Sequence, residues 1–166
     1  MRILGIDPGL ATVGLGLVEA NDRNDLTAIE WLTLTTKPHT ALPERLAELS
    51  KDLMSYLEEM KPDFAVVERN FFSVNEQSAL EVAHARGVIL LALNNANIPV
   101  GEATPLQLKS SITGDGKADK RQMQDMVVRT LGLTEIPKPD DAADGLALAI
   151  YGALTAHVHP AFLVRS

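Results

Sequence analysis

The stretch Ile3-Leu4-Gly5-Ile6-Asp7-Pro8-Gly9 is a short apolar run that ends on a carboxylate. Its aliphatic residues favour a β-strand, and Pro8 ends that strand at about Asp7, because proline cannot donate a hydrogen bond to a sheet ladder. A near-continuous apolar strand belongs in the middle of a sheet that is covered on both faces. Asp7 is therefore predicted at the carboxyl end of a central strand, where open α/β sheets usually place their chemistry. The alternative is that Asp7 has only a structural role, in which it accepts hydrogen bonds from the backbone amides of the turn.

The residues after this stretch predict a small sheet and one long helix. Residues 12–19 alternate between apolar and polar, and together with 26–36 they predict two more strands, joined by short turns into an antiparallel meander. Between Leu42 and Met60 apolar residues, mostly leucine, recur every three or four residues. That period indicates an amphipathic helix that packs on the sheet and ends near Pro62.

A second strand that ends on a carboxylate follows this helix. Residues 63–68 read Asp-Phe-Ala-Val-Val-Glu. The long helix before them predicts a crossover that lays this strand parallel to the first one. If the two strands are neighbours in the sheet, Asp7 and Glu68 emerge side by side.

The rest of the chain predicts one more strand and four helices. Thr104-Pro105 is a good helix start, with Thr as the N-cap and Pro at the first helical position. The predicted elements are a helix at 76–97, a strand at 98–100, a helix from 105 to about 113, a helix at 117–131 closed by Gly132, and a last helix from 140 onward.

Small residues spaced by four form a stripe along the 76–97 helix. Ala79, Ala83 and Gly87 would permit another helix to approach closely. The helix is apolar on almost all sides near its middle, so packing against its own sheet and contact with a second subunit remain equally open.

The last helix begins with Asp140-Asp141-Ala142-Ala143-Asp144. Acidic residues in a first turn stabilise the helix dipole, which accounts for Asp140. It does not account for Asp144, which lies beyond the first turn among small apolar residues. Asp141 and Asp144 are three residues apart and share one helical face.

Length and composition indicate a globular protein. The chain has 166 residues, 46% of them hydrophobic, which fits a single domain spanning 1–166 with a core of ordinary size. The absence of cysteine excludes disulfides and thiolate metal sites. No apolar run is long enough to cross a bilayer, and the N-terminus leads into a strand rather than a signal peptide. We expect a soluble cytoplasmic protein with no membrane partner.

The formal charge of −7 at first argues against a nucleic-acid partner. Its distribution weakens that argument, because residues 69–131 hold seven Lys or Arg and only six Asp or Glu. The densest basic cluster surrounds a flexible Gly-Asp-Gly loop and consists of Lys109, Lys117, Lys120 and Arg121. It is either a solvated helix start or a set of phosphate contacts. Phe71 and Phe72, in a polar segment after Glu68, are either core anchors or residues that stack on bases.

The chemistry that these residues suggest is metal-dependent. Four carboxylates lie at the ends of predicted elements: Asp7, Glu68, Asp141 and Asp144. Oxygen ligands without thiolates suit hard cations such as Mg²⁺ or Mn²⁺. Two such ions, about 4 Å apart, can activate water and stabilise the leaving oxygen in phosphodiester hydrolysis.

At this point the chain resembles the RuvC-type Holliday junction resolvases of the RNase H-like superfamily. The resemblance runs from Ile3 to about Ala156, and as an ordered set its motifs are specific. It is carried by 5–9, by 66–68 with Phe71-Phe72 behind them, by 85–87, by Lys109, by 118–120 and by 141–144.

The resemblance implies a mixed five-stranded α/β sheet of the RNase H-like kind, flanked by helices. It implies a homodimer, formed here through the 76–97 helix, that nicks opposed strands of a four-way junction symmetrically in recombination and repair. Asp7, Glu68, Asp141 and Asp144 carry over as the catalytic metal ligands. Lys109 and Lys120 match positions near the scissile phosphate, and Phe71 matches an aromatic that stacks on junction bases. A branch-migration helicase complex is the further partner that the resemblance implies.

Some positions depart from the family pattern. The last acidic position is Asp144, where some members use His, and Arg69-Asn70 has no assigned role. A basic tail of some relatives is missing, and His157 and His159 fit solvated helix-end residues better than ligands.

Two other classes compete with this reading. A nucleotide-binding ATPase or sugar-kinase lobe shares the opening motif but needs a second lobe to close over ATP. A non-catalytic junction-binding protein would not need four intact carboxylates.

Overall fold

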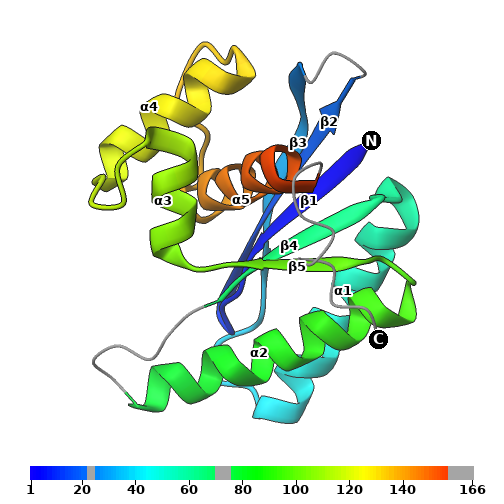
Figure 1. Ribbon diagram of the computed structural model, residues 1–166. Coiled ribbons are helices and arrows are strands. Elements are labelled where there is room, and N and C mark those ends of the chain that lie inside the picture. Colours follow the sequence, from blue (N-terminus) through cyan, green and yellow to red (C-terminus); the bar gives the residue numbers. More distant parts are fainter. Residues whose placement is uncertain (22–24, 70–75, 157–166) are drawn as a thin grey trace.

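The computed structural model describes residues 1–21, 25–69 and 76–156, and it is drawn in Figure 1. The strands are β1 (Arg2–Asp7), β2 (Thr12–Ala20), β3 (Leu26–Thr35), β4 (Phe64–Glu68) and β5 (Val100–Ala103). The helices are α1 (Leu42–Met60), α2 (Glu76–Asn95), α3 (Pro105–Thr113), α4 (Lys120–Leu131) and α5 (Asp140–Ala156). None of the helices within the described ranges is long and apolar enough to cross a membrane.

The strands form one mixed sheet in the order β3-β2-β1-β4-β5. β1 pairs antiparallel with β2, and β2 pairs antiparallel with β3, which confirms the predicted meander. β1 and β4 pair in parallel, with Ile6 opposite Val67, and β4 pairs in parallel with β5. The crossover through α1 is thereby confirmed, and β1 is the central strand. The five-stranded mixed sheet flanked by helices, which the family resemblance implied, is also confirmed.

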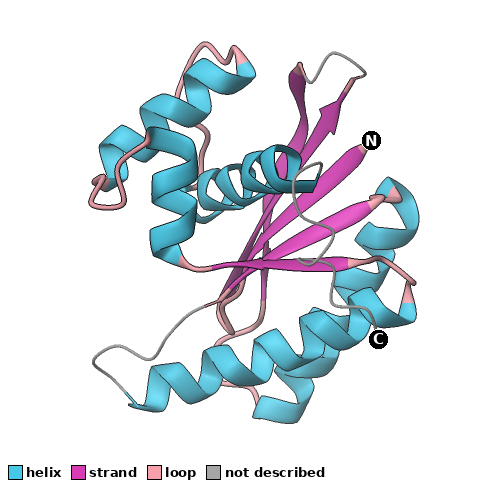
Figure 2. Ribbon diagram, viewed as in Figure 1, coloured by secondary structure: helices cyan, strands magenta, loops and turns pink. Residues whose placement is uncertain are grey.

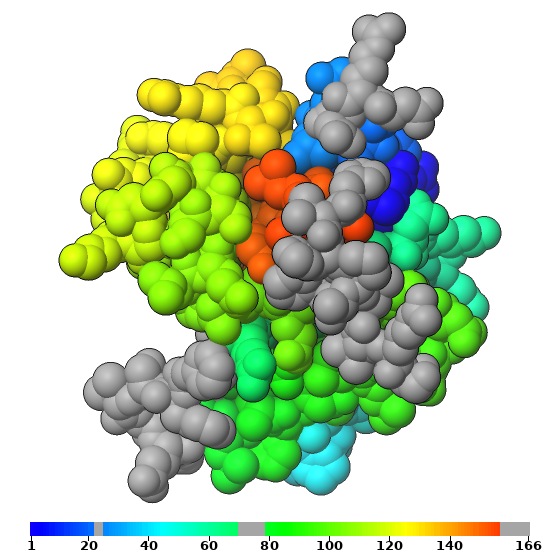
Figure 3. Space-filling view, in the orientation of Figure 1, coloured from blue at the N-terminus to red at the C-terminus, as the bar shows by residue number. Residues whose placement is uncertain are grey.

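Helices cover both faces of the sheet, as Figure 2 shows. On one face Leu4 and Ile6 pack in a core with Leu53 of α1 and Ile89 of α2. On the other face Ile3 and Val66 belong to a separate core that α3, α4 and α5 complete. The space-filling view shows α3 and α4, in yellow-green and yellow, gathered beside α5 (Figure 3). Since side chains alternate across a strand, neighbouring residues of β1 and β4 supply both cores.

Glycines allow α5 to lie directly on the sheet. A Cβ at Gly5 of β1 would overlap the Gly145 carbonyl of α5, and a Cβ at Gly16 of β2 would overlap the backbone at Leu146. Near the other end of the helix, Gly152 lies against Ile3 and Val66. α5 therefore runs antiparallel to β1, with its N-terminus beside the carboxyl end of that strand.

The bounds of three predicted elements differ from the structure by two residues or more. The strand predicted at 98–100 begins instead at Val100, because the Ile98 amide still donates to Leu93 of α2, and Asn97 adopts a left-handed φ of 56°. That turn also ends α2 at Asn95 rather than 97. The helix predicted from Lys117 begins at Lys120, because Asp119 caps it in a reciprocal pair with Gln122. The Thr104 cap predicted for α3 is confirmed.

Candidate active site

Asp7 and Glu68 end two neighbouring parallel strands and point to the same face of the sheet. The register pairs Ile6 with Val67, so the two carboxylates follow side by side. Gly5, two residues before Asp7, faces α5, and Val66, two residues before Glu68, packs in the core beneath α5. Because side chains alternate along a strand, both carboxylates lie on the α5 face. Each is half-buried.

The N-terminus of α5 brings two more carboxylates to this end of the sheet. Gly14 of β2 is the register partner of Asp7, and a Cβ at Gly14 would overlap the Asp141 carbonyl. The Asp141 backbone therefore lies against β2 next to Asp7. Asp144 lies three residues later on the same helical face as Asp141. Its carboxyl is close enough to Asp7 for the two charges to interact. The predicted gathering of carboxylates from β1, β4 and α5 is what the structure contains.

The ionisation of these groups reflects their proximity. Burial raises the pKa of Asp7 to about 8, and the charge of Glu68, a hydrogen bond shared with Glu68 and the charge of Asp141 add to the rise. Burial also raises the pKa of Glu68, reinforced by the charge of Asp144 and opposed by the hydrogen bond from Asp7. The pKa of Asp144 rises to about 6, mainly through burial, although the positive charge of Lys120 opposes the rise. Burial first and neighbouring carboxylates second thus favour the protonated forms of Asp7, Glu68 and Asp144.

Lys120 lies at the rim of this group. Its Nζ is 3.1 Å from Oδ2 of Asp140 and 3.8 Å from Oδ2 of Asp144. Its charge also reaches Asp7, where it acts to lower the carboxyl pKa. The structure thus brings one predicted basic residue to the predicted carboxylates.

The other members of the basic cluster do not join it there. Arg121 pairs with Asp125 one turn along α4, at 3.1 Å. Lys109 is half-buried on α3 and Lys117 is exposed before α4. Among the described residues no ion pair joins either of these two lysines to a carboxylate. Phe71, Phe72, His157 and His159 lie outside the described residues.

The donor set suits a divalent metal ion. Four carboxylates offer hard oxygen ligands of the kind that Mg²⁺ and Mn²⁺ prefer. As the side chains stand in the described part of the chain, no three His, Asp or Glu side chains converge closely enough to hold an ion. The Asp7 and Glu68 carboxyls are nevertheless close enough to share a hydrogen bond, and the charge of Asp141 acts on Asp7. The four carboxylates therefore suit a divalent cation, whose positive charge would balance their negative charges.

Comparison with known proteins identifies the family. The family model described as "Crossover junction endodeoxyribonuclease RuvC" matches residues 3–152. The chain belongs to the RuvC family. RuvC of Chloroflexus aurantiacus is 54% identical over 156 residues, which cover 94% of this chain and 94% of the relative.

Solved RuvC structures share the fold. The structure of Thermus thermophilus RuvC matches with a TM-score of 0.86 and 33% identity, covering 95% of this chain and 96% of that one. T. thermophilus RuvC in complex with a Holliday junction substrate matches with a TM-score of 0.89 and 29% identity, covering 99% of this chain and 100% of that one. These matches place the sheet and helices of this chain in the RNase H-like resolvase fold.

Sequence reasoning missed one contact at this RuvC site. The sequence explained Asp140 by the helix dipole alone. In the structure, Asp140 is nearer to Lys120 than Asp144 is. A usable signal was present, because Asp140 and Asp144 are four residues apart and so lie on neighbouring positions of the helix surface.

The raised pKa of Asp7 predicts that metal-free protein loses stability as pH rises. The folded state keeps a proton on Asp7 up to about pH 8, whereas the unfolded chain gives it up near the ordinary value of 3.8. Between these values the folded state binds more protons, so the free energy of unfolding falls with increasing pH. Asp7→Asn removes this cost, and we expect it to stabilise the metal-free protein at pH 8 by about 1–3 kcal/mol, or roughly 3–8 °C in Tm.

Thermal unfolding followed by circular dichroism at pH 6 and pH 8, with a chelator and then with Mg²⁺, measures this effect. Mg²⁺ should raise the Tm of the wild type at pH 8 but not that of Asp7→Asn. Asp52→Asn, at an exposed position on α1, is the matched control and should behave as wild type. A wild-type Tm that rises from pH 6 to pH 8 without metal would contradict the prediction.

Proposed function

We propose that the protein is a Holliday junction resolvase, a metal-dependent endonuclease that nicks opposed strands of four-way DNA junctions in recombination and repair. Membership of the RuvC family supports this proposal. So does the match to T. thermophilus RuvC in complex with a Holliday junction substrate. The observation that carries the proposal is the gathering of acidic side chains from β1, β4 and α5 at one end of the sheet.

The proposed catalytic metal ligands are Asp7, Glu68, Asp141 and Asp144. Two Mg²⁺ or Mn²⁺ ions, when bound, would activate a water molecule and stabilise the leaving oxygen of the cleaved strand. Asp7 and Glu68 stand on paired strands, so their backbones hold their separation rigidly. Asp141 and Asp144 are held by the close contact of α5 with the sheet. Lys120, at the rim of the group, is proposed to contact an oxygen of the scissile phosphate.

The proposed DNA contacts extend beyond this group. Lys109 is proposed, with Lys120, to lie near the scissile phosphate, as the family resemblance implies. Lys117 and Arg121 are proposed as phosphate contacts, supported by their exposure. Phe71 and Phe72 are proposed to stack on junction bases, each worth about 1–3 kcal/mol if it does so.

We propose a homodimer formed through the exposed face of α2. Ala85, Ile89 and Leu93 of this helix pack into the core against its own sheet. On the outer face Leu80 is 58% exposed and Leu91 is 59% exposed. Ala83 and Gly87 are also exposed there, and in the described part of the chain no atom beyond the neighbouring backbone of α2 lies within 4 Å of a Cβ built on Gly87. Because the helix contacts its own sheet with a different face, we propose that this exposed outer face receives a second copy.

Ala83→Leu should shift the protein towards monomer at micromolar concentration. Overpacking typically costs about 1–3 kcal/mol, and a symmetric interface would carry the change twice. Paired incision of a junction should fail while single nicks persist, since a monomer has one site. Sedimentation and a nick-versus-resolution assay measure both effects. Ala47→Leu, at an exposed position on α1, is the control and should stay as dimeric as the wild type. A wild-type protein that is monomeric and still cuts both strands in concert would overturn the proposed dimer.

The remaining proposals concern context. We propose that residues 1–166 form a single nuclease domain and that the protein acts in the cytoplasm. A branch-migration helicase complex is the proposed partner, on the basis of the family resemblance alone.

A labelled four-way junction, incubated with the protein with and without Mg²⁺ or Mn²⁺, tests the proposed function. We expect symmetric nicks in two opposed strands, only with metal, and little cleavage of a linear duplex of the same sequence. Equal cleavage of junction and duplex, or no cleavage of the junction with either metal, would contradict the proposal. ATP binding by the protein would instead favour the nucleotide-binding class.

A further inference from the structure

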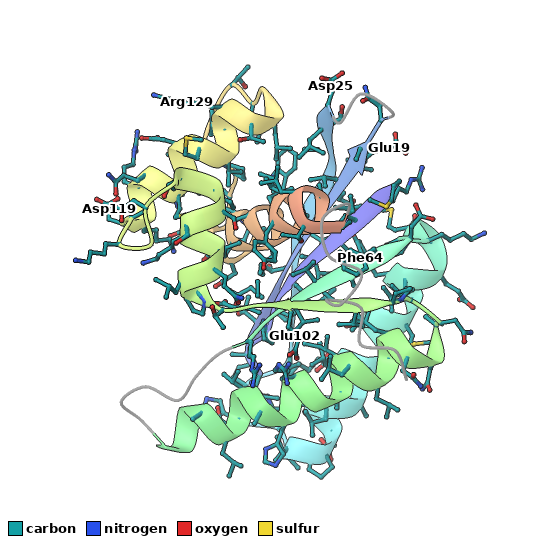
Figure 4. The ribbon with its side chains drawn as sticks, viewed as in Figure 1. Glu19, Asp25, Phe64, Glu102, Asp119 and Arg129 are labelled. Atoms are coloured by element: carbon teal, nitrogen blue, oxygen red, sulfur yellow. The ribbon has the colours of Figure 1, made fainter. Side chains whose placement is uncertain are left out.

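The position of Lys120 is not explained by the stability of its helix. It is the first helical residue of α4, directly after the Asp119 cap, which Figure 4 labels at the start of that helix. A positive side chain at a helix N-terminus is disfavoured by the helix dipole. The side chain therefore needs a partner outside α4.

Asp140 is that partner. Lys120 Nζ is 3.1 Å from Asp140 Oδ2 and 3.8 Å from Asp144 Oδ2. The other oxygen of Asp140, Oδ1, accepts a hydrogen bond from Lys138 Nζ at 3.3 Å. Each carboxylate oxygen of Asp140 thus contacts one lysine. Asp140 is not one of the four proposed metal ligands.

Without Asp140, the nearest anion for Lys120 is Asp144. Asp144 is a proposed metal ligand, and an ammonium group seated on it would compete with a cation for the same oxygens. In the structure the ammonium group lies nearer to Asp140 than to Asp144, although it still forms a long ion pair with Asp144. There it can move to a phosphate oxygen when DNA arrives.

We propose that Asp140 is a positioning residue that holds Lys120 beside the carboxylates and keeps it off the metal ligand Asp144. This inference rests on the proposed function, because it takes Asp144 as a metal ligand. Asp140 itself touches neither substrate nor metal in this scheme and acts only through Lys120.

Mn²⁺ binding to the DNA-free protein, followed by electron paramagnetic resonance, tests this role in a double-mutant cycle. Asp140→Asn should weaken Mn²⁺ binding about two- to five-fold, a modest effect because Lys120 and Asp140 are 55% and 47% exposed and exposed ion pairs are weak. In the Lys120→Ala background the same change should alter Mn²⁺ affinity by less than about two-fold. Asp140→Glu, which keeps the carboxylate, should restore most of the affinity.

Junction assays add a second readout. Asp140→Asn should lower the cleavage rate of bound junction by a similar factor while junction affinity holds or rises, because a negative charge is lost. Asp125→Asn breaks the comparable Arg121 pair on the same helix and should leave Mn²⁺ affinity of the DNA-free protein unchanged.

Equal losses of Mn²⁺ affinity from Asp140→Asn with and without Lys120 would overturn the inference, since the lost charge would then act directly on the metal. So would wild-type affinity in Asp140→Asn. Failure of the proposed function looks different, because the wild type itself would then bind no Mn²⁺ or leave junctions uncut, and that result would overturn both.

Discussion

We expect Asp7→Asn to abolish junction cleavage, with a rate at least about a thousandfold below wild type, while the variant still binds the junction. Asp7 ends the central strand, and its carboxylate lies beside Glu68 with Asp141 close enough to raise its pKa. In this variant an amide NH₂ group replaces one carboxylate oxygen. The change removes a hard anionic ligand and barely alters the size of the side chain. Glu68→Gln, Asp141→Asn and Asp144→Asn should act in the same way, because each removes one ligand of the same group.

Binding and cleavage must be measured separately for these variants. Each variant loses a negative charge that repels DNA, so junction affinity in Ca²⁺ should hold or rise while cleavage in Mg²⁺ is lost. Unfolding would not explain the loss, since Asp7→Asn is expected to be more stable than the wild type without metal. Asp52→Asn should cleave at the wild-type rate. Full activity of Asp7→Asn would rule out the proposed role of the carboxylate group.

Gly5→Val should destabilise the protein by about 3–5 kcal/mol, or prevent folding, because of the close contact between β1 and α5. A Cβ at Gly5 would overlap the backbone of α5 at Gly145 and Ala149. Neither backbone can yield without moving the helix, and the helix carries Asp141 and Asp144. Metal affinity should therefore fall together with stability.

Urea unfolding and Mn²⁺ binding measure the two consequences. Gly5→Ala is the milder variant that keeps the test usable if Gly5→Val does not fold. Gly87→Ala adds a methyl group that meets no described atom within 4 Å beyond the neighbouring backbone of α2, and in a helix it should be neutral or stabilise by about 0.5–1 kcal/mol. Because Gly87 lies on the proposed dimer surface, Gly87→Ala is a control for folding stability and not for dimer formation. Wild-type stability of both Gly5 variants would show that α5 is not packed as described.

Local signals in the chain determined most of the elements. The apolar run before Asp7, closed by Pro8, predicted β1 and its end correctly, and the leucine period from Leu42 predicted α1. The Thr104 cap predicted the start of α3. These signals work because strand propensity, helix period and capping depend on residues within a few positions of one another. The predicted bounds were wrong where the left-handed turn at Asn97 and the helix cap at Asp119 set the element ends.

Chain order also determined that the acidic residues could meet. A long helix between two short apolar strands indicates a parallel crossover, and it predicted that Asp7 and Glu68 emerge side by side if the two strands are neighbours. Their catalytic role, and those of Asp141 and Asp144, remain predictions for the cleavage assays above.

Tertiary structure alone decided how closely these groups meet and what surrounds them. Nothing local in the sequence says that Gly14 admits the backbone of Asp141, or which face of α2 stays exposed. The pairing of Lys120 with Asp140 joins residues twenty positions apart whose side chains meet only because α4 and α5 pack on one another. Contacts of this kind depend on the distance and orientation between elements, which packing sets and local pattern does not.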